Sequence, residues 1–184
     1  MPLVPGRVCG GCTVCCSELH IEAAELKKLA GVRCPNLDGG GLCAIYATRP
    51  GTCRDFECGW KLTATLSDAW RPDRSGIVLI PKTKGNPPGF QEGTGVQIVL
   101  LRREALGFPE LPGAVAAWVR TRVPLFLTLK APVGLLAASA FLNTLVEGAV
   151  RRQDRAALIQ VLEEMVEGLS RRKLEPATFG SAPR

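Results

Sequence analysis

The chain has 184 residues, of which 46% are hydrophobic and 22% are charged. A chain of this length and composition can bury a core of its own, which excludes an intrinsically disordered protein and a disulfide-stapled miniprotein. The 23 basic and 17 acidic residues leave a net charge of +6, too small and too evenly spread to indicate nucleic-acid binding.

The first sixty residues are predicted to be mostly loop. Residues 21–29 are predicted to form one short amphipathic helix, and few other large apolar residues occur there. All eight cysteines lie between residues 9 and 58. Burial alone cannot offset the conformational entropy of ordering such a segment, so we expect another interaction to hold it together.

The rest of the chain reads as alternating strands and helices. Strands are predicted at 77–80 and 96–101, within and after a turn-rich stretch over 71–95, as a hairpin or as neighbouring strands. A helix over 112–122, a strand over 125–129 and helices over 133–151 and 154–171 follow. The last helix carries one apolar stripe, formed by Leu158, Ile159, Leu162, Met165, Val166 and Leu169.

These elements predict an α+β fold: a loop-rich cysteine lobe followed by a small sheet and C-terminal helices. We expect residues 1–60 to be a metal-binding region and residues 61–184 to be an α+β body, together in one compact domain. The sequence has no secretory signal pattern and no apolar run long enough to span a bilayer, which favours a cytoplasmic protein without a membrane partner. In a reducing cytosol, clustered cysteines favour metal or redox chemistry over structural disulfides.

The cysteine spacing indicates a metal centre. Cys9-x2-Cys12-x2-Cys15-Cys16 is followed by Cys34, Cys43, Cys53 and Cys58. The eight thiols could form two sites of four, or one site of four with the others structural or redox-active. Because adjacent side chains usually point in different directions, Cys15 and Cys16 are expected to serve different metals or different irons of a cluster.

Thiolate ligands favour two cofactors, which the spacing does not separate. One is Zn²⁺ and the other is iron, as a mononuclear site or as a [4Fe-4S] cluster. Zinc fingers with two cysteines and two histidines are excluded, since His20 is the only histidine. The spacings of radical-SAM proteins and ferredoxins are also absent.

Four cysteine blocks resemble a known family. They are Cys9-Gly10-Gly11-Cys12-Thr13-Val14-Cys15-Cys16, Cys34-Pro35-Asn36-Leu37, Cys43-Ala44-Ile45-Tyr46 and Arg49-Pro50-Gly51-Thr52-Cys53-Arg54-Asp55-Phe56. In this order they are similar to the CxxCxxCC (YkgJ-type) cysteine-cluster family, and residues 71–76 look like an extension found in some members. The resemblance implies zinc or iron chelation. Because the family includes flagellin lysine N-methylases, a protein-modifying enzyme is the alternative.

Residues between the cysteines are candidates for supporting roles. Arg49 and Arg54 could donate hydrogen bonds to thiolate sulfurs, or could instead form surface ion pairs with Asp55 or Glu57. Tyr46 and Phe56 are expected to provide apolar cover. The function expected from these features is metal binding with a binding, sensing or structural role. In the structural case, the helices of residues 112–171 would dock an unidentified protein partner.

Overall fold

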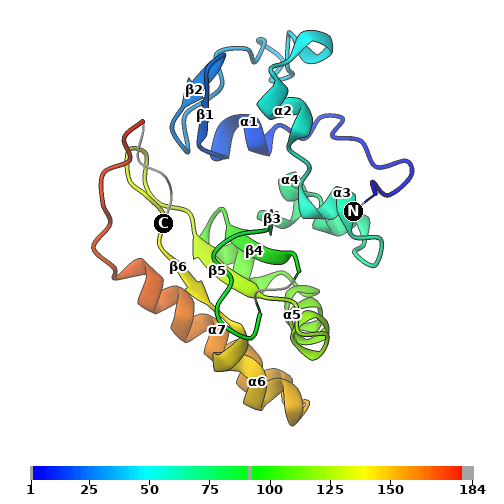
Figure 1. Cartoon of the computed structure of the whole chain (residues 1–184), viewed down its shortest axis with the longest axis vertical. Coiled ribbons are helices and arrows are strands. Elements are labelled where there is room, and N and C mark those ends of the chain that lie inside the picture. Colours follow the sequence, from blue (N-terminus) through cyan, green and yellow to red (C-terminus); the bar gives the residue numbers. More distant parts are fainter. Residues whose placement is uncertain (1, 91–92, 180–184) are drawn as a thin grey trace.

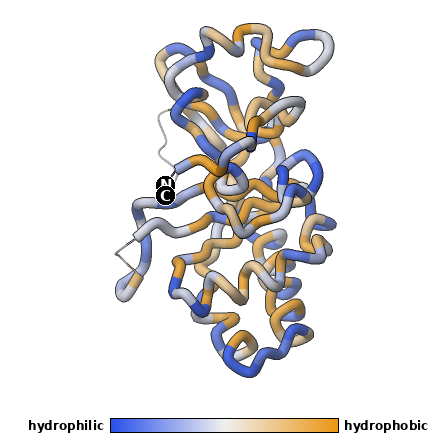
Figure 2. Tube along the Cα trace, turned by 90° about the vertical axis from the view of Figure 1, so that its right-hand side faces the viewer, coloured by the Kyte–Doolittle hydropathy of each residue, from blue (hydrophilic) through white to orange (hydrophobic). Residues whose placement is uncertain are grey.

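The computed structural model describes residues 2–90 and 93–179. Figure 1 shows a loop-rich lobe at the top, formed by the first sixty residues, above a sheet that helices cover from below. The α+β prediction is confirmed, including the loop-rich N-terminal region. Figure 2 shows hydrophobic segments concentrated inside the lower part, where the sheet lies.

The body is organised around a four-stranded mixed sheet in the order β3-β4-β5-β6. Strands β3 (Ile77–Lys82) and β4 (Gly95–Leu100) form an antiparallel pair, so the predicted hairpin is confirmed. Strand β5 (Leu125–Leu129), also predicted, runs parallel to β4 and follows it through helix α5 (Leu111–Arg120). Strand β6 (Ser139–Phe141) completes the sheet antiparallel to β5.

The hydrophobic core lies on one face of this sheet. Because side chains alternate between the faces of a strand, Leu79, Ile98 and Leu127 stand side by side and share this face. The intervening residues Val78 and Val99 are buried on the opposite face, outside this core. The sheet therefore has two apolar faces, of which the second is turned toward the cysteine lobe.

Three helices cover the core face: α5, α6 (Asn143–Arg151) and α7 (Arg155–Ser170). The predicted C-terminal helix is confirmed as α7, and its first turn is capped by the Asp154 carboxylate, which accepts from Ala157 N at 2.9 Å. Its buried residues are Leu158, Leu162, Val166 and Leu169. Ile159 and Met165, assigned to the same stripe, are only half-buried.

The helix expected over residues 133–151 is wrong in its first half. Residues 139–141 form β6, and the helix begins only at Asn143. The buried Asn143 side chain accepts from Leu125 N at 2.7 Å and donates to Val123 O at 2.8 Å, which fixes this boundary against β5. Sheet pairing and these two hydrogen bonds prevail over the apolar pattern.

The helix expected over residues 21–29 is also wrong. Strands β1 (Ile21–Ala23) and β2 (Leu26–Lys28) form an antiparallel hairpin instead. Burial in β2 has the two-residue period of a strand, because Leu26 and Lys28 are buried while Lys27 is exposed. The other short helices are α1 (Val14–Glu18), α2 (Gly51–Asp55), α3 (Gly59–Leu62) and α4 (Pro72–Ser75), with 3-10 turns at Tyr46–Thr48, Asp68–Trp70 and Arg103–Gly107.

Two segments connect the lobe with the body. Near the N-terminus, the Arg7 guanidinium donates to the carbonyls of Trp60, Thr63 and Leu66. On the opposite side, the C-terminal segment 174–179, drawn in orange-red in Figure 1, climbs from α7 past residues 134–136. Its Phe179 ring lies 5.7 Å from the His20 ring of the lobe.

Across the described ranges 2–90 and 93–179, no helix is both long and apolar enough to cross a bilayer.

Candidate metal centre

Four cysteines gather where the N-terminal segment passes α3. The backbone N–H of Cys12 donates to Cys9 O at 2.9 Å, which closes the turn between them. Val4 N donates to Lys61 O at 2.8 Å, so this segment runs beside α3, which Cys58 precedes. The Cys58 thiol is within electrostatic range of two further sulfurs. We name this set the first cysteine group: Cys9, Cys12, Cys15 and Cys58.

The other four cysteines are brought together by loop contacts around α1, and one of them, Cys53, is also within electrostatic range of Cys15. Cys34 N donates to Cys16 O at 2.9 Å, and Leu37, one turn after Cys34, bridges to Cys43. The Pro50 turn places Cys53 on α2, where Cys53 N donates to Pro50 O at 3.0 Å. Cys16 is within electrostatic range of the other three. This set is the second cysteine group: Cys16, Cys34, Cys43 and Cys53.

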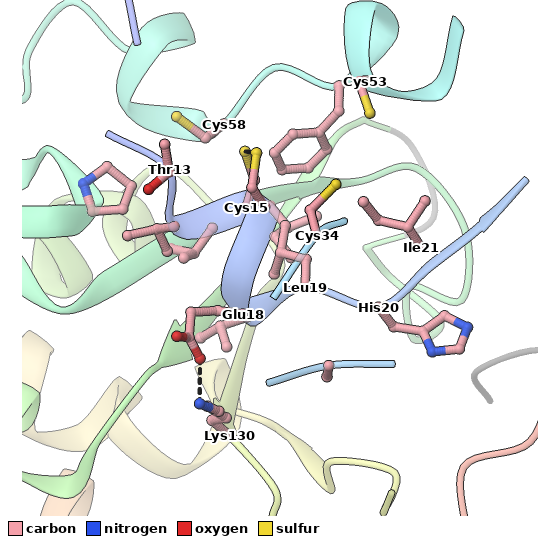
Figure 3. A pocket seen from close by; sticks show the side chains of 18 of the residues that line it. Thr13, Cys15, Glu18, Leu19, His20, Ile21, Cys34, Cys53, Cys58 and Lys130 are labelled. Atoms are coloured by element: carbon pink, nitrogen blue, oxygen red, sulfur yellow. Dashed lines mark hydrogen bonds and ion pairs between the residues drawn. The ribbon is translucent and has the colours of Figure 1, made fainter. Parts of the chain in front are cut away.

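The adjacent residues Cys15 and Cys16 join the two groups, with their sulfurs 3.9 Å apart. In Figure 3 the sulfur of Cys34 points toward that of Cys53, and Cys15 lies between these two and Cys58. Among the described residues, however, no three cysteine, histidine or acidic side chains stand close enough to hold one ion as placed. Thiol sulfurs are suitable ligands for a soft metal ion. To bind one, the sulfurs would have to move closer to one another than they are in this structure.

Burial affects the protonation of three of these thiols. It raises the pKa of Cys12, Cys53 and Cys58, because a thiolate is poorly solvated there. Cys16 is different: a hydrogen bond from the Cys15 thiol lowers the pKa of Cys16 and raises that of Cys15. Cys16 is therefore the member of this pair that ionises first.

Two buried lysines accompany the sulfurs, and the sequence did not single them out. Lys28 is 3% exposed, and its ammonium donates to the carbonyls of Leu19 and Leu29 with a further, longer contact to Ser17 O. Lys61 is 7% exposed and pairs with Glu57, with Nζ 2.5 Å from Oε2. Positive charge next to thiolates favours the metal-binding form of the ligands.

The arginines assigned a supporting role differ from each other. Arg49 stacks on Tyr46, with its guanidinium carbon 4.2 Å from the ring centroid, and lies within electrostatic range of Cys9. Arg54 is exposed on α2. Of the alternative partners Asp55 and Glu57, Glu57 pairs with Lys61 instead of with either arginine. Tyr46 is 53% exposed, so it does not shield the sulfurs as expected.

The segment 71–76 also reaches the cysteines. Asp73 on α4 lies against Cys12, which contributes to lowering the pKa of the carboxyl. The main cause of that lower pKa is Arg71, which donates to Asp73 through Nε at 2.7 Å and Nη2 at 2.5 Å. The sequence marked residues 71–76 only as a resemblance to a family extension and did not predict this contact.

Both cysteine groups open onto one large cavity of about 1440 Å³. Its roof is the cysteine lobe, and its floor is the second face of the sheet, including Val78, Ile80 and Val99. The C-terminal segment 172–177 closes one side. The ion pair between Lys130 and Glu18, drawn in Figure 3, joins floor to roof.

Comparison of the chain with protein-family models, curated proteins and solved structures finds no match.

Proposed function

We propose that this protein is a metal-chelating cysteine-cluster protein that binds zinc or iron through residues 9–58. One observation carries the proposal. Among described residues 2–58, Leu26 and Cys34 are the only buried hydrophobic residues, yet this lobe has a defined course and gathers eight thiols. A lobe with so small a core needs another source of stability, which a thiolate-bound metal supplies.

The two cysteine groups support a proposal of two metal sites. Each group offers four sulfurs, the number that a structural zinc or a [4Fe-4S] cluster takes. Cys15 belongs to the first group and Cys16 to the second, and since their sulfurs lie 3.9 Å apart, the two proposed sites would be immediate neighbours. The resemblance of the cysteine blocks to the CxxCxxCC family is consistent with this assignment. The role that follows is binding, sensing or structural.

The first test is the metal content and visible spectrum of protein purified reduced and without oxygen. Two equivalents of zinc in a colourless protein, or iron with acid-labile sulfide in a brown one, are the expected results. Less than one zinc or iron per chain would contradict metal binding.

The second test separates the sites. Cys12→Ser should remove the metal of the first cysteine group, and Cys43→Ser that of the second, so each variant keeps half of the metal. Ala47→Ser, at an exposed position of the same lobe, is the matched control and should keep all of it. Complete loss in both cysteine variants would instead indicate one shared cluster.

A further inference from the structure

The cavity beneath the cysteine lobe has an organised floor. Val78, Ile80 and Val99 give it an aliphatic surface on the sheet face that the three large helices leave free. Polar side chains interrupt this surface in one line across three strands. Gln97 Nε2 donates to Thr128 Oγ1 at 2.9 Å, and Thr128 Oγ1 donates to Ser139 Oγ at 3.0 Å.

This polar line ends at a cation. Arg172 Nη1 donates to the Ser139 carbonyl at 3.3 Å, so the guanidinium reaches the residue that carries the last hydroxyl of the line, and both residues line the cavity. Thr128 is only 2% exposed, which means that its hydroxyl is fixed by its two neighbours rather than by solvent. The Ser139 hydroxyl accepts from Thr128 and retains its own hydrogen for donation.

The charge of the described lining favours an anion at this end. Five basic and three acidic side chains line the cavity. Two of the acids are paired, Glu57 with Lys61 and Glu18 with Lys130. The third acid, Glu175, lies on the C-terminal segment with Arg172 and Lys173, so this end of the cavity keeps an excess of one positive charge.

We infer that this cavity binds a small amphipathic carboxylic acid, with its carboxylate at Ser139 and Arg172 and its apolar body over Val78, Ile80 and Val99. An aliphatic wall with a few converging polar groups is the usual composition of a small-molecule site. Arginine and a hydroxyl donor provide charge-assisted hydrogen bonds to a carboxylate. This inference goes beyond metal chelation and does not depend on which metal the lobe holds.

The test uses the full-length, metal-replete protein and a dansyl-labelled undecanoic acid as fluorescent probe. We expect saturable binding of one probe per chain, with displacement by dodecanoate and much weaker displacement by dodecanol. Arg172→Gln should weaken dodecanoate binding about tenfold, the value of one charge-assisted hydrogen bond, and leave dodecanol unaffected. Arg151→Gln, at the exposed end of α6, is the matched control and should bind like wild type.

The apolar part of the inference has its own variants. Ile80→Trp fills the floor and should abolish binding of both compounds, whereas Leu145→Trp, on an exposed part of α6, should not. If Ile80→Trp does not fold by circular dichroism, Ile80→Ala replaces it and should weaken binding of both compounds by removing apolar contact area from the floor. Absence of saturable probe binding to metal-replete protein, equal displacement by dodecanol and dodecanoate, or wild-type binding in Arg172→Gln would overturn the inference. Metal content is measured on the same samples. A sample without metal would count against the proposed metal binding and not against carboxylate binding.

Discussion

The Lys28 ammonium is a buried charge held by backbone carbonyls of its own lobe. Lys28→Met would retain much of the side-chain volume and remove the donor, leaving carbonyls without a partner. We expect the free energy of unfolding of the lobe to fall by about 1–3 kcal/mol, the cost of leaving such groups unsatisfied. Hydrogen exchange of residues 17–34 measures this loss.

Lys27 provides the matched comparison for Lys28, because it lies on the exposed face of the same strand. Lys27→Met should change the protection of residues 17–34 by less than about 0.5 kcal/mol. Equal effects of the two substitutions would show that the carbonyl contacts of Lys28 contribute nothing specific.

The Arg71–Asp73 pair predicts a pH dependence. Because the folded-state pKa of Asp73 lies below its value near 3.9 in an unfolded chain, the pair stabilises the fold above that value. This contribution is lost as the pH falls through the lower, folded pKa. In Arg71→Gln, the Asp73 pKa measured by carbon NMR should rise toward its ordinary value, and the variant and wild type should converge in stability at the acid end.

Arg74→Gln is the control for this titration. Arg74 contacts the Asp68 carbonyl at 3.4 Å rather than a carboxylate, so the Asp73 pKa should stay low. An unchanged Asp73 pKa in Arg71→Gln would contradict the assigned cause.

Helix α3 approaches strand β3 unusually closely at Gly59. A Cβ atom added there would lie 2.6 Å from Leu79 Cβ, a distance that requires the backbones to separate. Gly59→Ala should therefore lower the free energy of unfolding by about 1–3 kcal/mol in urea denaturation. Gly113→Ala on α5, where nothing lies within 4 Å, should instead be neutral or stabilising by up to about 1 kcal/mol. If Gly113→Ala lowered the free energy of unfolding more than Gly59→Ala, the packing of α3 on β3 would be contradicted.

Helix α7 contributes to stability through its buried stripe. Leu162 is 1% exposed within the main core, so Leu162→Ala should cost about 2–5 kcal/mol of unfolding free energy. Glu163→Ala, on the exposed side of the helix, should change it by less than about 0.5 kcal/mol. Thermal denaturation of the two variants checks this, and similar melting temperatures would show that α7 is not packed as described.

Elements with a strong local pattern could be predicted from the sequence, and those fixed by distant partners could not. The apolar, β-branched runs of β3 and β4 and the stripe of α7 report their own burial. Residues 133–142 are apolar enough for a helix, but their conformation depends on pairing with β5 and with residues 175–177. Residues 21–29 likewise form a hairpin in place of the predicted helix. Its buried lysine, Lys28, donates to backbone carbonyls, and the local sequence pattern gives no sign of these contacts.

The candidate site shows the same division. The cysteine spacing was sufficient to identify eight thiols as potential ligands. Their partition into two groups depends on where α1, α2 and α3 place them, and the lysines near them come from the unpredicted hairpin and from a turn of α3. The spacing of residues in the sequence predicts neither the grouping of the cysteines nor the positions of the two lysines.

The whole molecule should respond to metal removal in two stages. Binding free energy at thiolate sites is also folding free energy, on the order of 10 kcal/mol for a structural zinc. The body has its own core, so strong chelation should unfold residues 9–58 and leave α5, α6 and α7 intact by circular dichroism. Limited proteolysis should then cut between Gly10 and Lys61.

In a Trp60→Phe background, the remaining tryptophans Trp70 and Trp118 give an internal reference for this experiment, because both lie in or against the core of the body and outside the segment expected to unfold. Their emission should not shift on chelation. Unchanged cleavage within residues 10–61 would show that the lobe is ordered by packing and that metal is an accessory.

The C-terminal segment has a consequence for how the chain is made. Residues 174–179 reach back to pair with 134–136 and to place Phe179 against His20. During translation the cysteine lobe leaves the ribosome long before this segment exists, by on the order of ten seconds at ordinary synthesis rates. Throughout that interval the nascent thiols lack the cover that this segment and the sheet provide in the finished chain, so metal donors and oxidants should reach them more readily.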